Sequence, residues 1–196
     1  MNEYIITLGF IKSRLDPCIY YKREKRNERV MFLGLYVDDV MIAFHDEEEL
    51  RDVTLKLEER FSIKMIGSVK KFFGITVHET QQSYFLSQQS IICHALCAFN
   101  LEHVRTFTTP MDPNTDYNGT DSEELVDLHR VREALGTLLW ITNSTRPDIT
   151  YATNFASRQR DKPGKCHWEL IKSIFSISRS HRIVVCATGR QVRLFS

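Results

Sequence analysis

A long apolar run, broken once by a pair of aspartates, constrains the fold of this 196-residue chain more than any other feature. Residues 30–37 are apolar, Asp38 and Asp39 interrupt them, and residues 40–44 resume the run. Two β-rich runs separated by two polar residues predict a tight β-hairpin that turns at Asp38-Asp39. Because neither arm alternates with polar residues, we expect both faces of the hairpin to be covered.

Composition excludes several classes of protein. Hydrophobic residues make up 42% and charged residues 26%, which is typical of a globular domain and not of a disordered tail or a collagen-like repeat. No run approaches the ~20 apolar residues of a membrane helix, and the first residues lack the basic-then-apolar order of a secretory signal. Five cysteines, an odd number, favour reduced thiols. We therefore expect a cytoplasmic or nuclear protein that is not secreted and has no membrane partner.

The order of periodic patterns predicts an α+β fold. Residues 47–61 have helical spacing, residues 62–66 look extended, and residues 72–77 and 84–86 form a second hairpin. Four more helices are expected at 87–99, 125–142, 148–158 and 166–178. The expected domains are therefore an antiparallel part at 1–86 with one helix, a helical region at 87–178, and a divergent tail at 179–196.

The adjacent carboxylates suggest a metal site. Asp-Asp is a common turn pair, so a purely structural turn is one interpretation. The other is a bound divalent cation, because two anions among apolar neighbours repel each other and lose hydration. Hard carboxylate oxygens suit Mg²⁺ or Mn²⁺. The spacing alone leaves both interpretations open.

These residues resemble a known family. Tyr36-Val37-Asp38-Asp39 is similar to the Tyr-x-Asp-Asp box of reverse transcriptases, and further blocks in the same order are similar to the copia-type (pseudovirus) LTR-retrotransposon polymerase. The resemblance covers the C-terminal half of that polymerase domain. It implies that residues 1–86 form a partial palm with the box and the primer grip, and that residues 87–178 form the thumb or connection. The main blocks are Asp16-Pro17-Cys18-Ile19-Tyr20-Tyr21, Lys71-Phe72-Phe73-Gly74-Ile75-Thr76-Val77, Thr109-Pro110-Met111-Asp112, Gly136-Thr137-Leu138-Leu139-Trp140, Thr145-Arg146-Pro147-Asp148-Ile149-Thr150-Tyr151-Ala152 and Pro163-Gly164-Lys165-Cys166-His167-Trp168.

The resemblance implies a nucleotidyltransferase, an RNA-directed DNA polymerase that uses two metal ions. It implies that Asp38 holds the catalytic Mg²⁺ (or Mn²⁺), with Asp39 a weaker contributor. Its partners would be an RNA template with a DNA primer and a deoxynucleoside triphosphate. Nucleic-acid contacts are implied for Tyr36 and Met41 beside the primer terminus, Phe73 and Gly74 in the primer grip, and Arg146, Arg158 and Lys165 in the thumb.

Several of these roles have structural alternatives. Lys64 could act as a general acid toward pyrophosphate or be a plain surface lysine. Arg146-Pro147-Asp148 could contact a phosphate, or it could simply start a helix. Trp168 could stack on a base or fill a helical core. The two basic stretches, residues 22–29 and 158–193, permit nucleic-acid binding but are equally compatible with a solvated face.

The resemblance also implies an absence. Two-metal polymerisation needs a third carboxylate on a separate palm strand, and none of the acids before Asp38 stands in the family's first-aspartate motif. We therefore expect a truncated piece of a Pol polyprotein that is inactive alone, binds Mg²⁺ weakly and leaves a palm edge exposed. The alternatives are a non-catalytic binding module for RNA or an RNA–DNA hybrid, a relic with no maintained role, and a polymerase assembled in trans.

Overall fold

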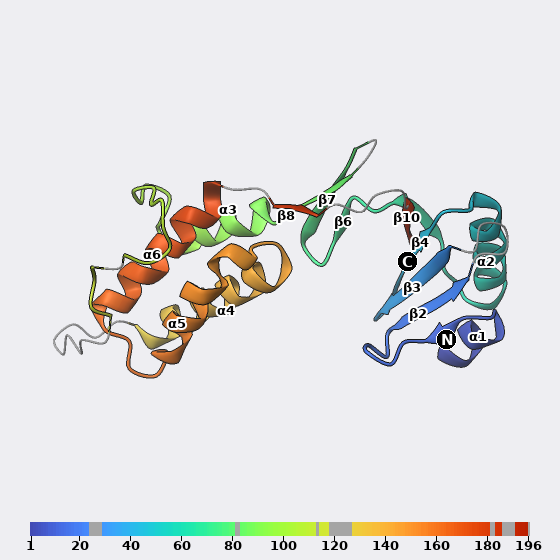
Figure 1. Ribbon diagram of the computed structural model, residues 1–196, viewed down its shortest axis with the longest axis horizontal. Helices are drawn as coiled ribbons and strands as arrows, with labels where there is room; N and C mark the ends of the chain where they lie inside the picture. The colour runs from blue at the N-terminus through green and yellow to red at the C-terminus, as the bar shows by residue number, and fades with distance from the viewer. Residues whose placement is uncertain are drawn as a thin grey trace. The chain divides into compact units, whose positions relative to one another are not determined.

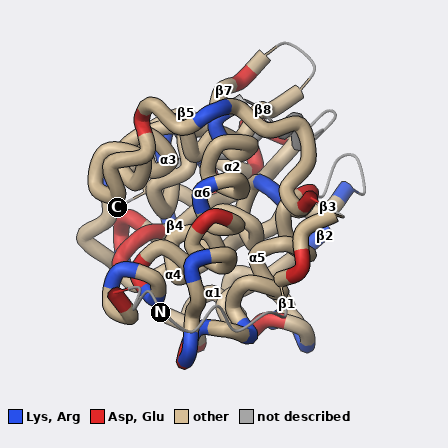
Figure 2. The backbone as a smooth tube through the Cα atoms, turned by 90° about the vertical axis from the view of Figure 1, so that its left-hand side faces the viewer, with Lys and Arg blue, Asp and Glu red and all other residues tan. Residues whose placement is uncertain are grey.

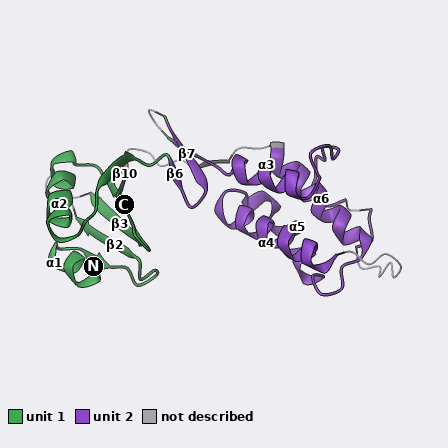
Figure 3. Cartoon of the chain, turned by 180° about the vertical axis from the view of Figure 1, so that it is seen from behind, with its two compact units in different colours: residues 1–70, 80–83, 186–196 green, residues 71–79, 84–185 purple. Residues whose placement is uncertain are grey.

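The computed structural model describes residues 1–23, 29–80, 83–112, 114–117, 127–180, 183–185 and 191–195. These form two compact units, shown in Figure 1 and coloured separately in Figure 3. The sheet unit comprises residues 1–70, 80–83 and 186–196, and the helical unit comprises 71–79 and 84–185. Antiparallel sheets combine with helices in both, which confirms the expected α+β class. In the described part of the chain, no helix has the length and apolar character required to cross a bilayer.

The sheet unit is built on one antiparallel sheet in the order β1-β2-β3-β4-β10-β5. Two helices accompany it, α1 (Asn2–Thr7) and α2 (Glu47–Arg60). The last strand in the sequence lies between β4 and β5, so the segment expected as a divergent tail takes part in this sheet. The strands are β1 (Ile11–Lys12), β2 (Ile19–Arg23), β3 (Val30–Tyr36), β4 (Asp39–Phe44), β5 (Met65–Ser68) and β10 (Gln191–Phe195).

Only one face of this sheet is fully buried. Along β4 and the first part of β3 every second side chain is buried, whereas the residues between them are only partly buried, and Tyr36 at the end of β3 is exposed. The buried set packs against α1 and α2, because side chains alternate between the faces of a strand. The expectation that both faces are covered is therefore wrong for the described residues. The core consists of Ile5, Phe10, Tyr20, Met31, Leu33, Val40, Ile42, Phe44, Leu50, Val53, Leu57 and Phe195.

The helix expected at 47–61 is confirmed as α2. The Asp46 carboxylate caps it, accepting hydrogen bonds from the backbone N–H groups of Glu48 at 2.9 Å and Glu49 at 3.2 Å. Glu49 also pairs with Lys22 of β2 at 2.7 Å, and both side chains are largely buried. This ion pair ties the first turn of α2 to the sheet.

The helical unit combines a small antiparallel sheet, ordered β6-β7-β8-β9, with four α-helices and a 3-10 turn. Its strands are β6 (Lys71–Phe72), β7 (Ile75–Glu79), β8 (Tyr84–Ser87) and β9 (Ile183–Val185). Its helices are α3 (Gln89–Ala98), α4 (Leu128–Ser144), η1 (Pro147–Ile149), α5 (Thr150–Arg158) and α6 (Lys165–Ser180). The single strand expected at 72–77 is wrong, because a tight turn at Phe73 and Gly74, with φ of 52° and 75°, splits it into β6 and β7.

The segment before α4 is bound to α6 by polar side chains. The Ser176 hydroxyl donates to the Arg105 carbonyl at 2.9 Å, and the Ser173 hydroxyl lies 3.1 Å from the Pro110 carbonyl. The His167 Nδ1 accepts from the Gly164 N–H at 2.9 Å, and Nε2 lies 2.9 Å from the Tyr117 carbonyl. Since Nδ1 is the acceptor, Nε2 carries the proton and donates to Tyr117. Sequence periodicity gave no sign of these contacts.

Candidate active-site hairpin and nucleic-acid interface

The hairpin expected around the aspartates is present, but its turn lies one residue earlier than predicted. Tyr36, the last residue of β3, pairs directly with Asp39, the first residue of β4. The two turn residues are therefore Val37 and Asp38. Val37 has φ 52° and is 86% exposed. A β-branched residue in the left-handed region is an outlier, and such strain occurs at functional sites.

The strand register places the two carboxylates in different local environments. Asp38 is exposed at the apex of the hairpin. Asp39 lies in β4 on the same face as Met41, opposite to the buried Val40. Within the described residues, neither carboxylate forms a hydrogen bond or an ion pair.

The donor chemistry of the pair suits a hard divalent cation. Across the residues that the structure describes, however, no group of three His, Cys, Asp or Glu side chains gathers as a metal site. The residues therefore fit a magnesium ion by type of ligand but not by number.

Three more candidates belong to the sheet unit. Tyr36 is 53% exposed and stands opposite Asp39, and Met41 is half-buried opposite Gly34. Both therefore lie beside the aspartates on one face of the hairpin. Lys64 is exposed in the extended segment before β5.

The expected primer-grip residues lie in the helical unit. Phe73 and Gly74 form the turn between β6 and β7 and are half-buried. A side chain at Gly74 would approach the Ile91 Cδ1 atom of α3 to 3.0 Å, and its positive φ also favours glycine. This turn is thus packed against α3, which accounts for the glycine structurally.

Among the residues that the structure describes, Arg146 is the largest fully buried side chain, with 1% of its surface exposed. Its Nε and Nη2 donate to the two oxygens of Asp148 at 2.8 and 2.7 Å, and its Nη1 donates to the Ser178 carbonyl at 2.6 Å. The guanidinium also reaches the Ile177 carbonyl at 3.3 Å. A buried guanidinium engaged in this way is not presented to a phosphate. The geometry favours the structural interpretation: Arg146 joins the start of η1 to the end of α6.

The remaining helical candidates divide between surface and core. Arg158, at the end of α5, and Lys165, at the start of α6, are both exposed. Trp168 packs against the core, with its ring centroid 6.3 Å from that of Phe99 and the Arg130 guanidinium 4.8 Å above it. Its core interpretation is therefore the one that the contacts favour. Figure 2 shows acidic and basic residues at many points along the backbone tube.

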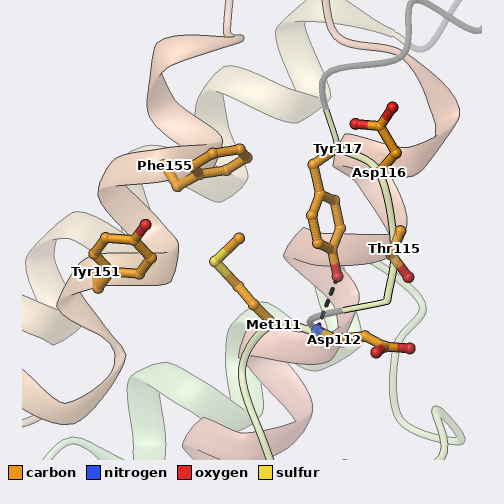
Figure 4. Close-up of a pocket in the computed structure, with 7 residues that line it drawn as sticks. All are labelled: Met111, Asp112, Thr115, Asp116, Tyr117, Tyr151 and Phe155. Atoms are coloured by element: carbon orange, nitrogen blue, oxygen red, sulfur yellow. Dashed lines mark hydrogen bonds between the residues drawn. The ribbon is translucent and has the colours of Figure 1, made fainter.

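Two hollows of the helical unit were missed from the sequence. Met111, Asp112, Asp116, Tyr117 and Tyr151 belong to a cavity of about 340 Å³ (Figure 4), completed by Thr115 and Phe155. The Asp112 N–H donates to the Tyr117 hydroxyl at 3.1 Å, which fixes the ring in the cavity. Its charged lining residues are both acidic, so this cavity does not suit a phosphate.

The second hollow is a groove of about 380 Å³ between α4 and α5. Arg132 and Arg160 line it, and both lie near the Asp161 carboxylate, at 3.1 and 3.9 Å. Gly136 forms part of its floor, and a side chain built there would meet nothing within 4 Å. The groove is thus open and contains two arginines.

The comparisons with known proteins identify the class to which this hairpin belongs. The family model described as "Reverse transcriptase (RNA-dependent DNA polymerase)" matches residues 1–113, and the chain therefore belongs to the reverse transcriptase family. This confirms the family that the Tyr-x-Asp-Asp resemblance predicted. No solved structure matches the chain.

The chain is also similar to particular transposon proteins. It is 31% identical over 186 residues to the retrovirus-related Pol polyprotein from transposon TNT 1-94 of Nicotiana tabacum, and 29% identical over 174 residues to that from transposon RE1 of Arabidopsis thaliana. These alignments cover 91% and 89% of this chain but only 14% and 12% of the relatives. The putative transposon Ty5-1 protein YCL074W of Saccharomyces cerevisiae is 25% identical, with 56% of its length covered. The chain thus corresponds to a part of a retrotransposon Pol polyprotein.

Proposed function

We propose that this chain carries the aspartate hairpin of an RNA-directed DNA polymerase and is catalytically incomplete by itself. The observation that carries the proposal is the hairpin. It presents Asp38 at an exposed apex and Asp39 beside Tyr36 and Met41, on the face that α1 and α2 do not bury. Family membership adds the reaction class: nucleotidyl transfer to a primer on an RNA template.

Asp38 and Asp39 are the residues that would hold Mg²⁺ or Mn²⁺. A divalent cation held there would supply positive charge to phosphate oxygens during phosphoryl transfer. The protein's own contribution is to hold both carboxylates on a rigid hairpin that is anchored by Val40 and Ile42 in the core. Tyr36 and Met41 would contact the primer end on the same face.

The incompleteness follows from the number of carboxylates. Two-metal polymerisation calls for a third acidic ligand, and the described residues supply none at this hairpin. Two carboxylates without a third bind a divalent cation weakly, because each lost carboxylate removes both a ligand and a negative charge.

Metal binding and activity are tested separately. Titration of the full chain with Mn²⁺, followed by water-proton relaxation, should show weak binding that Asp38→Asn or Asp39→Asn reduces at least fivefold. Asp52→Asn on α2 is the matched control, since it removes the same charge from an exposed site 3.6 Å from Lys56. If Asp52→Asn lowers Mn²⁺ binding as much as Asp38→Asn does, the hairpin is not the metal site.

Primer extension on a homopolymer RNA template with Mn²⁺ tests the reaction. We expect no incorporation by the isolated chain. Incorporation that Asp38→Asn abolishes would establish the reaction class and refute the incompleteness.

The groove between α4 and α5 favours a second candidate function, binding of RNA or an RNA–DNA hybrid without catalysis. Arg132 and Arg160 line this groove, and Arg158 is exposed at the end of α5. Arginine and lysine side chains contact phosphates without reading sequence. The binding module would then use the helical unit alone.

Salt dependence tests this function, because each phosphate that the protein neutralises contributes about −0.9 to the slope of log K against log salt. Arg158→Glu combined with Lys165→Glu should weaken hybrid binding and reduce the magnitude of the slope by about 2. Lys56→Glu in the sheet unit is the control. Binding that is indifferent to salt, or equally sensitive to Lys56→Glu, would exclude the helical interface.

A further inference from the structure

The edge of β4 is covered by the end of the chain. The resemblance predicts an exposed palm edge, but β10 pairs with β4 over five positions, from Gln191 opposite Phe44 to Phe195 opposite Val40. On its other side β10 pairs with β5. A strand from the divergent tail therefore occupies the position beside the aspartate hairpin, and among the described strands it is β10 that joins β5 to the sheet.

Two side chains of β10 hold it in place. Phe195 is fully buried in the core of the sheet unit. Arg193 lies over the Phe44 ring at 5.5 Å and is 3.5 Å from the Glu47 carboxylate. The strand is also attached by backbone pairing to β4 and β5, which does not depend on side-chain identity. The position between β4 and β5 is therefore a strand slot that another sequence of similar pattern can fill.

The register relates this slot to the aspartates. Because the pairing is antiparallel and Phe195 stands opposite Val40, a strand in this slot that kept the same register for one more residue would place that residue opposite Asp39. Directly opposed residues share one face of the sheet, with Cβ atoms about 5 Å apart. A strand that placed a carboxylate at this next position would set it beside Asp39. The described residues of β10 include no acid.

We propose that β10 is an intramolecular strand plug that fills the slot beside the hairpin and excludes a strand from another polypeptide. The partner that fits the slot is an extended segment with an apolar residue opposite Val40 and an acid one position further, opposite Asp39. The role of that acid as a further ligand for the metal ion rests on the proposed function, whereas the proposal that β10 fills the slot does not.

Peptide exchange on the full chain tests the plug. The probe is a fluorescent peptide with the sequence of residues 186–196, and binding is followed by anisotropy. Phe195→Ala in the protein removes the apolar anchor. A buried Phe→Ala loss corresponds to a factor of about 100 or more in an opening equilibrium. We therefore expect the peptide to bind this variant at least tenfold more tightly than the wild-type chain.

Two controls make the result specific. A disulfide made by Val192→Cys with Ala43→Cys, which stand directly opposite each other, should abolish peptide binding. A peptide carrying Phe195→Ala should bind at least tenfold more weakly. If Phe195→Ala disrupts folding by circular dichroism, Arg193→Ala replaces it, because Phe195 then remains. The plug proposal is refuted if the peptide binds equally to the wild-type chain, the Phe195→Ala or Arg193→Ala variant and the disulfide-locked chain. It is also refuted if the peptide binds none of them.

A second peptide, carrying Ser196→Asp, tests the partner. Bound to the Phe195→Ala chain, it should raise Mn²⁺ affinity at least fivefold over the unmodified peptide. Peptide exchange without this gain refutes the acidic partner and leaves the plug intact. Loss of exchange with Mn²⁺ still bound at Asp38 refutes the plug and leaves the proposed function intact.

Discussion

Removing the buried guanidinium of Arg146 should destabilise the helical unit more than any other single change among its arginines. The substitution Arg146→Met keeps most of the apolar volume and deletes the donors to Asp148, Ile177 and Ser178. Two carbonyls at the end of α6 and one carboxylate then lose the hydrogen bonds that Arg146 donates, at a side chain that is only 1% exposed. Because the Asp148 side chain is 47% exposed, most of the cost comes from the buried carbonyls, and each buried acceptor that loses its donor costs about 1–3 kcal/mol.

The measurement is urea unfolding followed by tryptophan fluorescence. Both tryptophans, Trp140 and Trp168, belong to the helical unit, so the signal reports the unfolding of that unit. Arg132→Met is the matched control, because its ion pair with Asp161 at 3.1 Å is exposed and should contribute about 0–1 kcal/mol. Asp148→Asn should cost less than Arg146→Met, since an amide oxygen still accepts one hydrogen bond.

The comparison of Arg146→Met with Arg132→Met decides whether the buried hydrogen bonds of Arg146 stabilise the helical unit. If Arg146→Met lowers the free energy of unfolding by no more than Arg132→Met, the buried network does not stabilise the unit. The phosphate-contact interpretation of Arg146 would then regain support. A loss of hybrid binding in a variant of Arg146 that folds normally would have the same meaning.

Three further changes have defined outcomes. His167→Ala should lower the free energy of unfolding of the helical unit by about 1–2 kcal/mol in urea, because the His167 ring accepts a hydrogen bond from the N–H of Gly164 just before α6. His167→Gln should restore much of this stability, because the glutamine oxygen can accept the same hydrogen bond. Val37→Gly should stabilise the sheet unit by about 0.5–1 kcal/mol in thermal unfolding, because glycine adopts φ 52° without strain. A hydrogen bond from Cys97 to Glu102, together with the carboxylate's charge, raises the pKa of the thiol. Thiolate therefore forms at higher pH, and Glu102→Gln should speed alkylation at pH 8. No change in that rate would argue against the contact.

Local patterns in the sequence determined much of this protein. The apolar run with its two aspartates predicted the hairpin of β3 and β4, and helical spacing predicted α2, α3, α4, α5 and α6 to within a few residues. These predictions are correct because the spacing of apolar residues that distinguishes a strand from a helix can be read from consecutive residues. The turn was placed one residue late. Val37 continues the apolar run of β3, so its residue type gave no indication that it, and not Asp39, would be a turn residue with φ 52°.

The tertiary structure alone decided the rest. Pairing between strands depends on backbone hydrogen bonds, which are the same for every sequence, so no pattern could place β10 between β4 and β5. Nothing in the sequence distinguishes Arg146 from an exposed arginine. Its burial and its hydrogen bonds to Asp148 and to the end of α6 arise only in the folded structure. Residues far apart in the chain meet because an apolar core draws them together and every buried polar group then needs a partner.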